Sequence, residues 1–311
     1  MAITNLTAEE RDTKTFDELA CSPSLVGELQ QQSTYFSAVN ILFSITAFLG
    51  NSLILVALHK EHSLHPPSKF LYRCLATTDL LIGLVSQPHN ATYWMSLVHE
   101  QWSLCRYLYD IAYITSYALC GASLTTMTAI SVDRLLALLL GMRYRQIVTV
   151  KRIFITLAFL WVLCGIAALS YILDKRITFW CGCVVVTSCL VISIASYTKI
   201  FRALSHHRAQ VQSHLRQQPS QANRLNMARY KKAVYSALWV QLALVVCYVP
   251  YSIIEIQITY SKTYSHLVVS RGIGVALVYF NSTLNSFLYC WKITEIRQAV
   301  KETIRQALCC S

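Results

Sequence analysis

Seven long apolar segments dominate this chain and limit the folds open to it. They lie at about 35–58, 70–94, 104–140, 153–173, 177–204, 230–258 and 266–290, separated by turn or charged residues. Each is long enough to cross the hydrocarbon core of a bilayer, which takes about 20 residues of helix. Charged residues make up only 14% of the 311, whereas a soluble domain carries about a quarter. The sequence therefore predicts an all-α membrane protein built as a seven-transmembrane helix bundle.

Basic residues indicate how this bundle is oriented. Lysine and arginine accumulate in the loops on the cytosolic side of a membrane. In this chain 20 of the 27 lysines and arginines lie in or beside alternate loops and in the C-terminal region, and 7 lie on the other side. Topology thus explains the net charge of +12, and no nucleic-acid partner is expected. We expect a multi-pass plasma-membrane protein, embedded in the lipid bilayer, with its N-terminus outside.

The same pattern divides the chain into three regions. Residues 1–34 form a polar outer tail, residues 35–292 the transmembrane bundle, and residues 293–311 an amphipathic helix with a short cytoplasmic tail. In the third region apolar residues recur at helical spacing opposite charged ones, which indicates an eighth helix lying on the inner leaflet. Inside the bundle, the loop at about 205–228 is expected to be long and partly mobile.

Two kinds of covalent modification are predicted at the ends of the chain. Asn5-Leu-Thr7 in the outer tail is a glycosylation acceptor pattern. Asn90-Ala-Thr92 matches the pattern too, but it lies close to the end of a predicted span, so glycosylation there is less expected. Cys309 and Cys310, next to the amphipathic helix, are acylation candidates.

An adjacent acid and base, Asp133 and Arg134, stand near the inner end of the third segment. Charged side chains are costly in lipid, so this pair must lie at the aqueous boundary or face protein. Arg143 and Arg145, just beyond it, favour the cytosolic boundary. On this evidence the pair is either a functional element or a neutralised pair that snorkels at a helix end.

Several polar residues lie inside the predicted spans. Asp79 is in the middle of the second, Ser123 is in the third, and Asn281 and Asn285 share one face of the seventh. A carboxylate with several oxygen donors nearby can hold a small hard cation. A hydrogen-bonded polar cluster that joins the helices, or a protonated Asp79, remains an equally open interpretation.

Taken together, these motifs resemble those of the rhodopsin-family G protein-coupled receptors over nearly the whole chain. The matching residues are Gly50-Asn51, Leu75-Ala-Thr-Thr-Asp79, Asp133-Arg134, Trp161, Tyr197, Cys247-Tyr-Val-Pro250 and Asn285-Ser-Phe-Leu-Tyr289. The segment that begins at Tyr289 is similar to the start of the eighth helix in adenosine receptors. The very short outer loop 174–176, and a fifth helix without proline, are similar to features of melanocortin receptors.

The resemblance implies a signalling role with named residues. It implies that an extracellular ligand, a small molecule or a peptide, activates a heterotrimeric G protein. Asp133 would hold Arg134 at rest and release it when helix six moves outward. The other residues implied in this switch are Tyr197, Tyr248, Pro250, Asn285 and Tyr289. A Na⁺ ion held by Asp79, Ser123, Asn281 and Asn285 is also implied, with no other cofactor.

The chain departs from the family pattern at several positions. Leu135 replaces the usual tyrosine after Asp-Arg, and Tyr248 stands where most relatives have tryptophan. Ser286 replaces a proline, so helix seven is expected to be straighter, whereas Pro250 is expected to kink helix six. The inner end of helix six, 229–232, is basic and carries no acid to restrain Arg134, so we expect basal signalling.

The family's usual outer disulfide is also doubtful in this chain. Cys105 lies one helical turn earlier than the family's outer cysteine. The short second outer loop offers no obvious partner, because Cys181 and Cys183 are expected to belong to helix five. Cys21 in the tail is a rival partner, and the pairing stays open.

The ligand pocket implied by the resemblance lies in the outer third of the bundle. No lysine occurs in the seventh segment, which disfavours retinal, and Ser116 stands where amine receptors have aspartate. Asp110, Ser116, Glu255 and Arg271 are the candidate ligand contacts. For Glu255 and Arg271 the preferred alternative is that they pair with each other or with water. A membrane transporter or channel is the alternative function, although no internal repeat supports it. No nucleophile–base or metal-ligand spacing points to an enzyme.

Overall fold

The computed structural model describes residues 20–61, 64–215, 221–260, 265–292 and 294–309. Within these ranges every regular element is helical, which confirms the all-α prediction. The elements are α3 (Pro23–Lys60), α4 (Pro66–Leu81), the π-helical η1 (Ile82–Ser86), α5 (Gln87–Val98), α6 (Trp102–Leu140), η2 (Gly141–Arg143), α7 (Tyr144–Ile147), α8 (Val150–Leu169), η3 (Ser170–Ile172), α9 (Lys175–Leu215), α10 (Gln221–Tyr260), α11 (Ser265–Lys292) and α12 (Thr294–Cys309).

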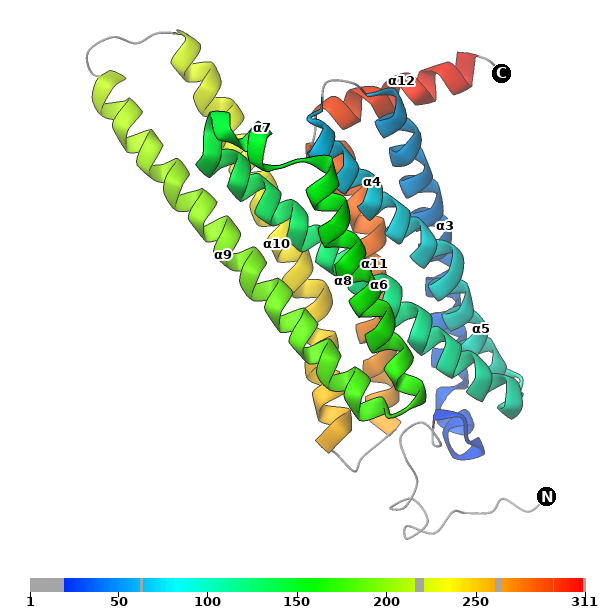
Figure 1. The fold of residues 1–311 in the computed structure, drawn as a ribbon. Helices are drawn as coiled ribbons and strands as arrows, with labels where there is room; N and C mark the ends of the chain where they lie inside the picture. The colour runs from blue at the N-terminus through cyan, green and yellow to red at the C-terminus, as the bar shows by residue number, and fades with distance from the viewer. Residues whose placement is uncertain (1–19, 62–63, 216–220, 261–264, 293, 310–311) are drawn as a thin grey trace, which may run out of the picture.

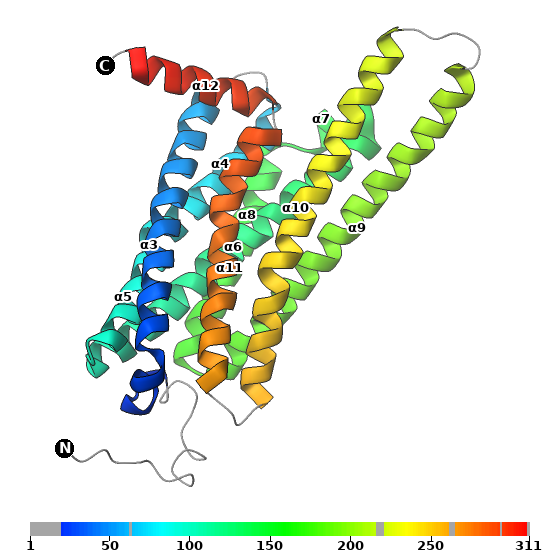
Figure 2. The same ribbon diagram turned by 180° about the vertical axis from the view of Figure 1, so that it is seen from behind.

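The helices form the predicted seven-helix bundle, with α6 at its centre (Figures 1 and 2). α6 packs against α4, α5, α8 and α9, while α11 packs against α10 and α3, so the helices close into a ring. Leu124 and Met127 of α6 and Tyr279 of α11 belong to the buried core that this ring encloses. The bundle therefore places polar residues of α6 within reach of four neighbouring helices.

Six of the helical stretches are each long and apolar enough to cross a membrane. The predicted second span, 70–94, is not among them; in the structure it runs through α4, the π-helical turn η1 and α5. Such turns occur within α-helices and are frequent at functional sites. Ser44 of α3 donates a hydrogen bond to the Gly83 carbonyl in this turn (2.6 Å). The chain stays helical from Pro66 to Val98, so the three parts together supply the seventh crossing.

α8 shows why the low content of charged residues fits a membrane better than a large core. Phe154, Phe159 and Ile166 on its outer face are 56%, 62% and 61% exposed. Such a large apolar surface is stable only against hydrocarbon or a partner. Trp161, which is half-buried, donates a hydrogen bond to Thr126 Oγ1 of α6 (3.1 Å). This bond fixes which face of α8 turns toward the bundle.

Several helices extend beyond the predicted apolar segments. α3 begins at Pro23, before the predicted span at residue 35. α9 continues to Leu215 and α10 begins at Gln221, so the predicted long loop 205–228 is largely helical, apart from 216–220 outside the described residues. The physical reason is that apolar residues mark the part of a helix that lies in lipid, whereas residues such as Gln, Arg and Ala continue the helix in water.

α12 lies across one end of the bundle, at the opposite end from the start of α3 (Figure 1); this end, which the sequence analysis expects to face the cytosol, is called the inner end below. Ile296 and Val300 are buried, whereas Lys301 and Arg305 on the other face are exposed. Lys60 at the end of α3 donates a hydrogen bond to Gln306 Oε1 (2.6 Å). The predicted amphipathic eighth helix is therefore present and is attached to α3.

Candidate functional site

The carboxylate of Asp133 is buried at the inner end of α6 and accepts hydrogen bonds from two other elements. Ser68 Oγ of α4 donates to Asp133 Oδ2 (2.9 Å), and the Tyr144 hydroxyl of α7 donates to Oδ1 (2.5 Å). Only 3% of the Asp133 side chain is exposed. The α6–α7 turn passes through Gly141, whose φ of +49° a residue with a side chain rarely adopts. This turn brings Tyr144 back beside Asp133.

Arg134 is only loosely paired with its neighbour. Its Nη2 lies 3.8 Å from Asp133 Oδ2, which is beyond hydrogen-bond distance, and 42% of its side chain is exposed. Its guanidinium lies over the ring of Tyr72, 5.5 Å from the centroid, and Tyr72 in turn packs edge-on against Tyr289 (5.0 Å). Ser68 and Tyr144, rather than Arg134, therefore donate the hydrogen bonds that Asp133 accepts.

The remaining residues of the implied switch lie on the helices around Arg134. Tyr197 of α9 is buried and accepts a hydrogen bond from Ser131 Oγ of α6 (3.1 Å). Tyr289 of α11 is buried beside Tyr72. Tyr248 and Pro250 lie in α10, which continues through the proline. The side chains of 206–238, including the basic cluster 229–232, lie outside those that the structure describes.

Asp79 is fully buried at the centre of the bundle. Ser123 Oγ of α6 donates to Asp79 Oδ1 (2.8 Å), and Asn285 Nδ2 of α11 donates to Oδ2 (2.9 Å). Asn281 Nδ2 contacts Met127 Sδ (3.4 Å), and its carbonyl oxygen Oδ1 is buried without a hydrogen-bond partner. The structure thus places Ser123 and Asn285 on the Asp79 carboxylate, and Asn281 is linked to them through Met127, which Asn285 also contacts (3.6 Å).

Close packing of α3 against α11 supports this polar cluster. A Cβ on Gly50 would lie 2.5 Å from Ser286 Oγ and 3.1 Å from its Cβ, so a larger residue here would displace the Ser286 side chain. Asn51 donates to the Ala47 carbonyl (2.9 Å) and to the Ser282 carbonyl of α11 (3.2 Å). The pair Gly50-Asn51 therefore fixes the height at which α11 presents its asparagines to Asp79.

A cavity of about 140 Å³ lies between helices toward the outer end of the bundle. Ser116 of α6, Glu255 of α10 and Arg271 of α11 line it. Ser116 is hydrogen-bonded to the Tyr279 hydroxyl. Arg271 Nε donates to Glu255 Oε1 (2.8 Å), so these two residues pair with each other.

Asp110 lies elsewhere. It is exposed, accepts a hydrogen bond from the Tyr171 hydroxyl (2.7 Å) and is not among the residues that line the cavity. The sequence analysis named it among the candidate ligand contacts, and it precedes Ser116 by six residues on one helix. That spacing turns its side chain to a different face of α6.

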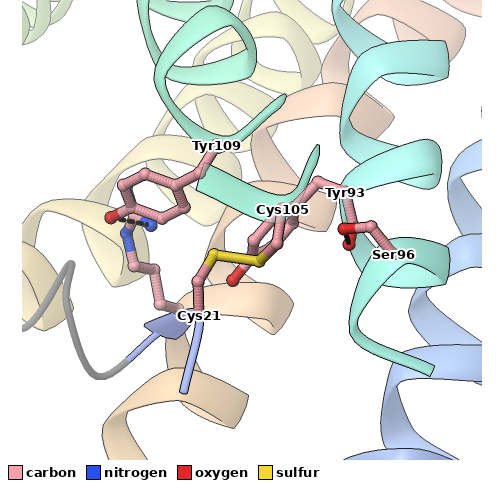
Figure 3. The surroundings of a disulfide bond; sticks show 6 residues. Cys21, Tyr93, Ser96, Cys105 and Tyr109 are labelled. Atoms are coloured by element: carbon pink, nitrogen blue, oxygen red, sulfur yellow. Dashed lines mark hydrogen bonds between the residues drawn. A yellow bond between two sulfur atoms is a disulfide. The ribbon is translucent and has the colours of Figure 1, made fainter. Parts of the chain in front are cut away.

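A disulfide joins Cys21, just before α3, to Cys105 near the start of α6 (Figure 3). Tyr93 and Tyr109 lie beside it, and both also line the cavity. Cys181 and Cys183 lie on α9 and are free. The structure therefore decides the open question in favour of the tail cysteine.

The predicted modification sites lie largely outside what the structure describes. Asn5 and Cys310 are outside the described residues, as is the side chain of Cys309. The second glycosylation pattern is inaccessible, because Asn90 is buried in α5 and donates a hydrogen bond to Asn40 Oδ1 (3.1 Å).

The sequence analysis missed the aromatic residues that connect these sites. Tyr72 stands between Arg134 and Tyr289, and Tyr144 holds Asp133. In sequence, Tyr72 is one apolar residue among many in the second span. Tyr144 was visible only as the middle residue of a basic tripeptide. Neither position shows a periodic or charge signal that would single it out.

Comparisons with known proteins agree with this geometry. The sequence model of the family described as "7 transmembrane receptor (rhodopsin family)" matches residues 50–179. The adenosine receptor A3 of Ovis aries is 22% identical over 308 residues, covering 89% of this chain and 92% of that receptor. Melanocortin receptor 5 of Mus musculus is 22% identical over 284 residues, covering 88% and 83%. The histamine H2 receptor of Cavia porcellus is 29% identical over 141 residues, which is 45% of this chain and 38% of that receptor.

These relatives match a chain whose seven helices, buried Asp79 cluster and Asp133-Arg134 pair are arranged as described above. The two long alignments cover 89% and 88% of this chain, far more than one shared motif. The protein is a multi-pass membrane protein, and it resembles the receptors of the rhodopsin family in sequence and in the arrangement of its helices.

Proposed function

We propose that this receptor binds an extracellular ligand in its outer cavity and promotes nucleotide exchange on a heterotrimeric G protein in the cytosol. The observation that carries the proposal is the environment of Arg134. It is a partly exposed cation at the inner end of the central helix, loosely paired with Asp133 and lying over the Tyr72 ring. A residue in this position is available to a cytosolic partner. The receptors named for adenosine, histamine and melanocortin, to which the chain is similar, support the same function.

The proposed mechanism is a shift between two arrangements of the bundle. At rest, Asp133 is occupied by Ser68 and Tyr144, and Arg134 lies against Tyr72. A ligand that binds the active arrangement more tightly than the resting one would increase the population of the active arrangement. The size of this increase is set by the difference between the two affinities. In that arrangement α10 would move outward at its inner end, and Arg134 would be released to contact the G protein.

The Asp79 cluster is proposed to hold Na⁺ in the resting arrangement. The residues fit such an ion: the Asp79 carboxylate, the Ser123 hydroxyl and the otherwise unpaired Asn281 Oδ1 are hard oxygen donors. Among the described residues Asp79 has no salt-bridge partner. A fully buried carboxylate needs a counterion or a proton. When bound, the ion would supply the positive charge that neutralises Asp79, and a proton is the competing explanation.

The test is ligand-dependent nucleotide exchange in membranes that contain the receptor and a purified heterotrimeric G protein. We expect faster guanine-nucleotide exchange than in membranes from mock-transfected cells, and a further increase with an active compound from a broad panel. The Arg134→Ala variant, present at the same surface level, is expected to show no increase. A transporter or channel would instead move a solute across the membrane without accelerating exchange.

A further inference from the structure

The chemistry of the ligand follows from the lining of the outer cavity. We propose that this cavity binds an uncharged aromatic molecule that has one ring or two fused rings and carries a hydrogen-bond acceptor. The inference deepens the proposed function, because it treats this cavity as the receptor's ligand site. It rests on the volume of the cavity, on the residues that line it, on their charges and on their unpaired polar atoms. None of these observations involves the G protein.

Size and lining indicate an aromatic ligand. The cavity has a volume of about 140 Å³, close to the roughly 150 Å³ at which an apolar protein cavity binds benzene. Nine of the 27 residues that line it are aromatic, among them Tyr93, Tyr113, Tyr117, Phe179, Tyr251 and Tyr279. Flat rings offer stacked and edge-on contacts to another ring. On the outer side, Cys21 and Cys105 pack in an apolar cluster with Tyr93, so these surroundings are apolar too.

The charges in the lining cancel each other. Among the described residues that line the cavity, Glu255 is the one acid and Arg271 the one base, and they form an ion pair at 2.8 Å. Each side chain is only 14% exposed. Arg271 also donates from Nη1 to the Tyr109 hydroxyl (2.7 Å), and it lies over the Tyr113 ring. The pair is therefore held by the protein itself, and the cavity has no net charge.

This balance disfavours charged ligands. A carboxylate that bound Arg271 would leave Glu255 without its partner in a poorly hydrated place, and an ammonium bound to Glu255 would do the same to Arg271. Leaving one member of a buried ion pair unpaired is strongly unfavourable. A zwitterion would have to compete with an ion pair that forms within the protein at no cost in association entropy. A neutral ligand leaves the pair intact.

Two unpaired polar atoms indicate where the acceptor belongs. Most polar side chains of the lining are satisfied within the protein: Ser116 by Tyr279, Ser252 by the Tyr248 carbonyl and Asn90 by Asn40. By contrast, Trp94 Nε1 and the Tyr117 hydroxyl are buried without a hydrogen-bond partner. Trp94 is only 4% exposed. Its indole N–H can only donate, so it requires an acceptor, which a ligand would supply.

The test uses four compounds that share one ring and differ in charge. They are indole-3-propionamide (neutral), indole-3-propionate (anion), tryptamine (cation) and tryptophan (zwitterion). Apparent dissociation constants are obtained from the thermal unfolding midpoint of purified receptor at increasing compound concentration. We expect the propionamide to bind at least about tenfold more tightly than each charged compound. The proposal is overturned if a charged member binds wild-type receptor most tightly, or if none of the four stabilises it.

Three variants test the causes separately. Glu255→Gln leaves Arg271 unpaired, so the preference is expected to move toward indole-3-propionate, and Arg271→Gln is expected to move it toward tryptamine. Trp94→Phe is expected to weaken propionamide binding about three- to tenfold while leaving 3-propylindole, which has no acceptor, unchanged. Tyr107→Phe, at an exposed tyrosine, is the control. If a variant does not fold, the wild-type series alone still decides the proposal. Because this assay contains no G protein, a failure of nucleotide exchange would not affect its result.

Discussion

At the scale of single residues, the structure changes how the Asp133-Arg134 pair is understood. Adjacent residues of opposite charge suggest a pair that restrains itself. In the structure the acid is instead bound by Ser68 and Tyr144, and its distance to Arg134 is 3.8 Å. The carboxylate has a limited number of acceptor positions, so these donors compete with Arg134 for it. The restraint on Arg134 at rest therefore depends on residues outside α6.

This competition gives a prediction for Tyr144→Phe. The ring, which packs against His65, is kept, while Asp133 Oδ1 loses its donor and becomes available to Arg134. Arg134 is partly exposed, so the stronger pairing is expected to stabilise the resting state by only about 0.5–1 kcal/mol. Basal nucleotide exchange should fall about two- to fivefold. Tyr107→Phe is the matched control, and an increase in basal exchange in Tyr144→Phe would contradict the competition.

Asp79 provides a second prediction at this scale. If Na⁺ binds beside it, the ion stabilises the folded receptor in proportion to its occupancy. The thermal unfolding midpoint of purified receptor should therefore be higher in sodium chloride than in choline chloride of equal ionic strength. Asp79→Asn should remove this difference, and Asp174→Asn, at an exposed acid, should keep it. Equal midpoints for wild-type receptor in both salts would show that the cluster is only structural. Once an agonist is known, sodium should also alter its affinity, because the coupling is reciprocal.

At the scale of helices, the sequence predicts the crossings better than their ends. The seven apolar segments mark where helices lie in lipid, and the structure contains helices at all seven. Apolarity carries no information on where backbone hydrogen bonding stops, so α3, α9 and α10 extend beyond the segments. The π-helical turn η1 was not predictable either, because Ile82 and the residues after it continue the same apolar run.

The functional site likewise contains some features that the sequence predicts and others that it does not. Residues that carry family motifs, such as Asp79 and Asn285, are found together because their positions along the helices were fixed by recognisable patterns. Contacts between segments distant in sequence were not determined in this way. The partner of Cys105 depends on how the tail approaches α6, and several pairings were compatible with the sequence. The contact of Arg134 with Tyr72 depends in the same way on how α4 packs against α6.

The disulfide between Cys21 and Cys105 is expected to stabilise the outer end of the bundle. It connects residues 84 apart in sequence, and a crosslink over such a distance typically contributes about 2–4 kcal/mol. Cys21→Ser and Cys105→Ser should each lower the thermal unfolding midpoint. The double variant should lower it no further, because both changes remove the same bond. Cys181→Ser and Cys183→Ser, at free cysteines, are the controls. Additive effects of the first two variants would mean that the bond is not formed.

At the scale of the whole molecule, the distribution of basic residues gives a prediction of orientation. With 20 of 27 lysines and arginines on one side, we propose that the end carrying α12 faces the cytosol. An epitope tag at residue 3 should be accessible to antibody on intact cells, and a tag within 217–221 only after permeabilisation. An antibody against a cytosolic protein, which should not stain unpermeabilised cells, checks that the cells are intact. Staining of the second tag on intact cells would reverse the topology and remove the basis of the receptor mechanism.

The last prediction concerns the balance between the resting and active states. The inner end of helix six, 229–232, contains no acid that could restrain Arg134, and the nearby Asp133 is occupied by Ser68 and Tyr144. With both restraints weak, the active state should lie closer in free energy, and about 1.4 kcal/mol changes its population roughly tenfold. We therefore expect measurable nucleotide exchange without ligand.

Variants at both partners check this balance. Arg134→Ala should abolish ligand-independent exchange while surface expression stays intact, because the cation that contacts the G protein is lost. Tyr230→Glu should lower it by supplying the missing acid, whereas Tyr230→Gln, of nearly equal size but uncharged, should not. Tyr197→Phe should weaken signalling without removing ligand binding, because its hydroxyl is expected to contact Arg134 in the active state. Basal exchange no higher than in mock-transfected cells, with receptor at the surface and a matched G protein present, would show that another restraint holds Arg134 at rest.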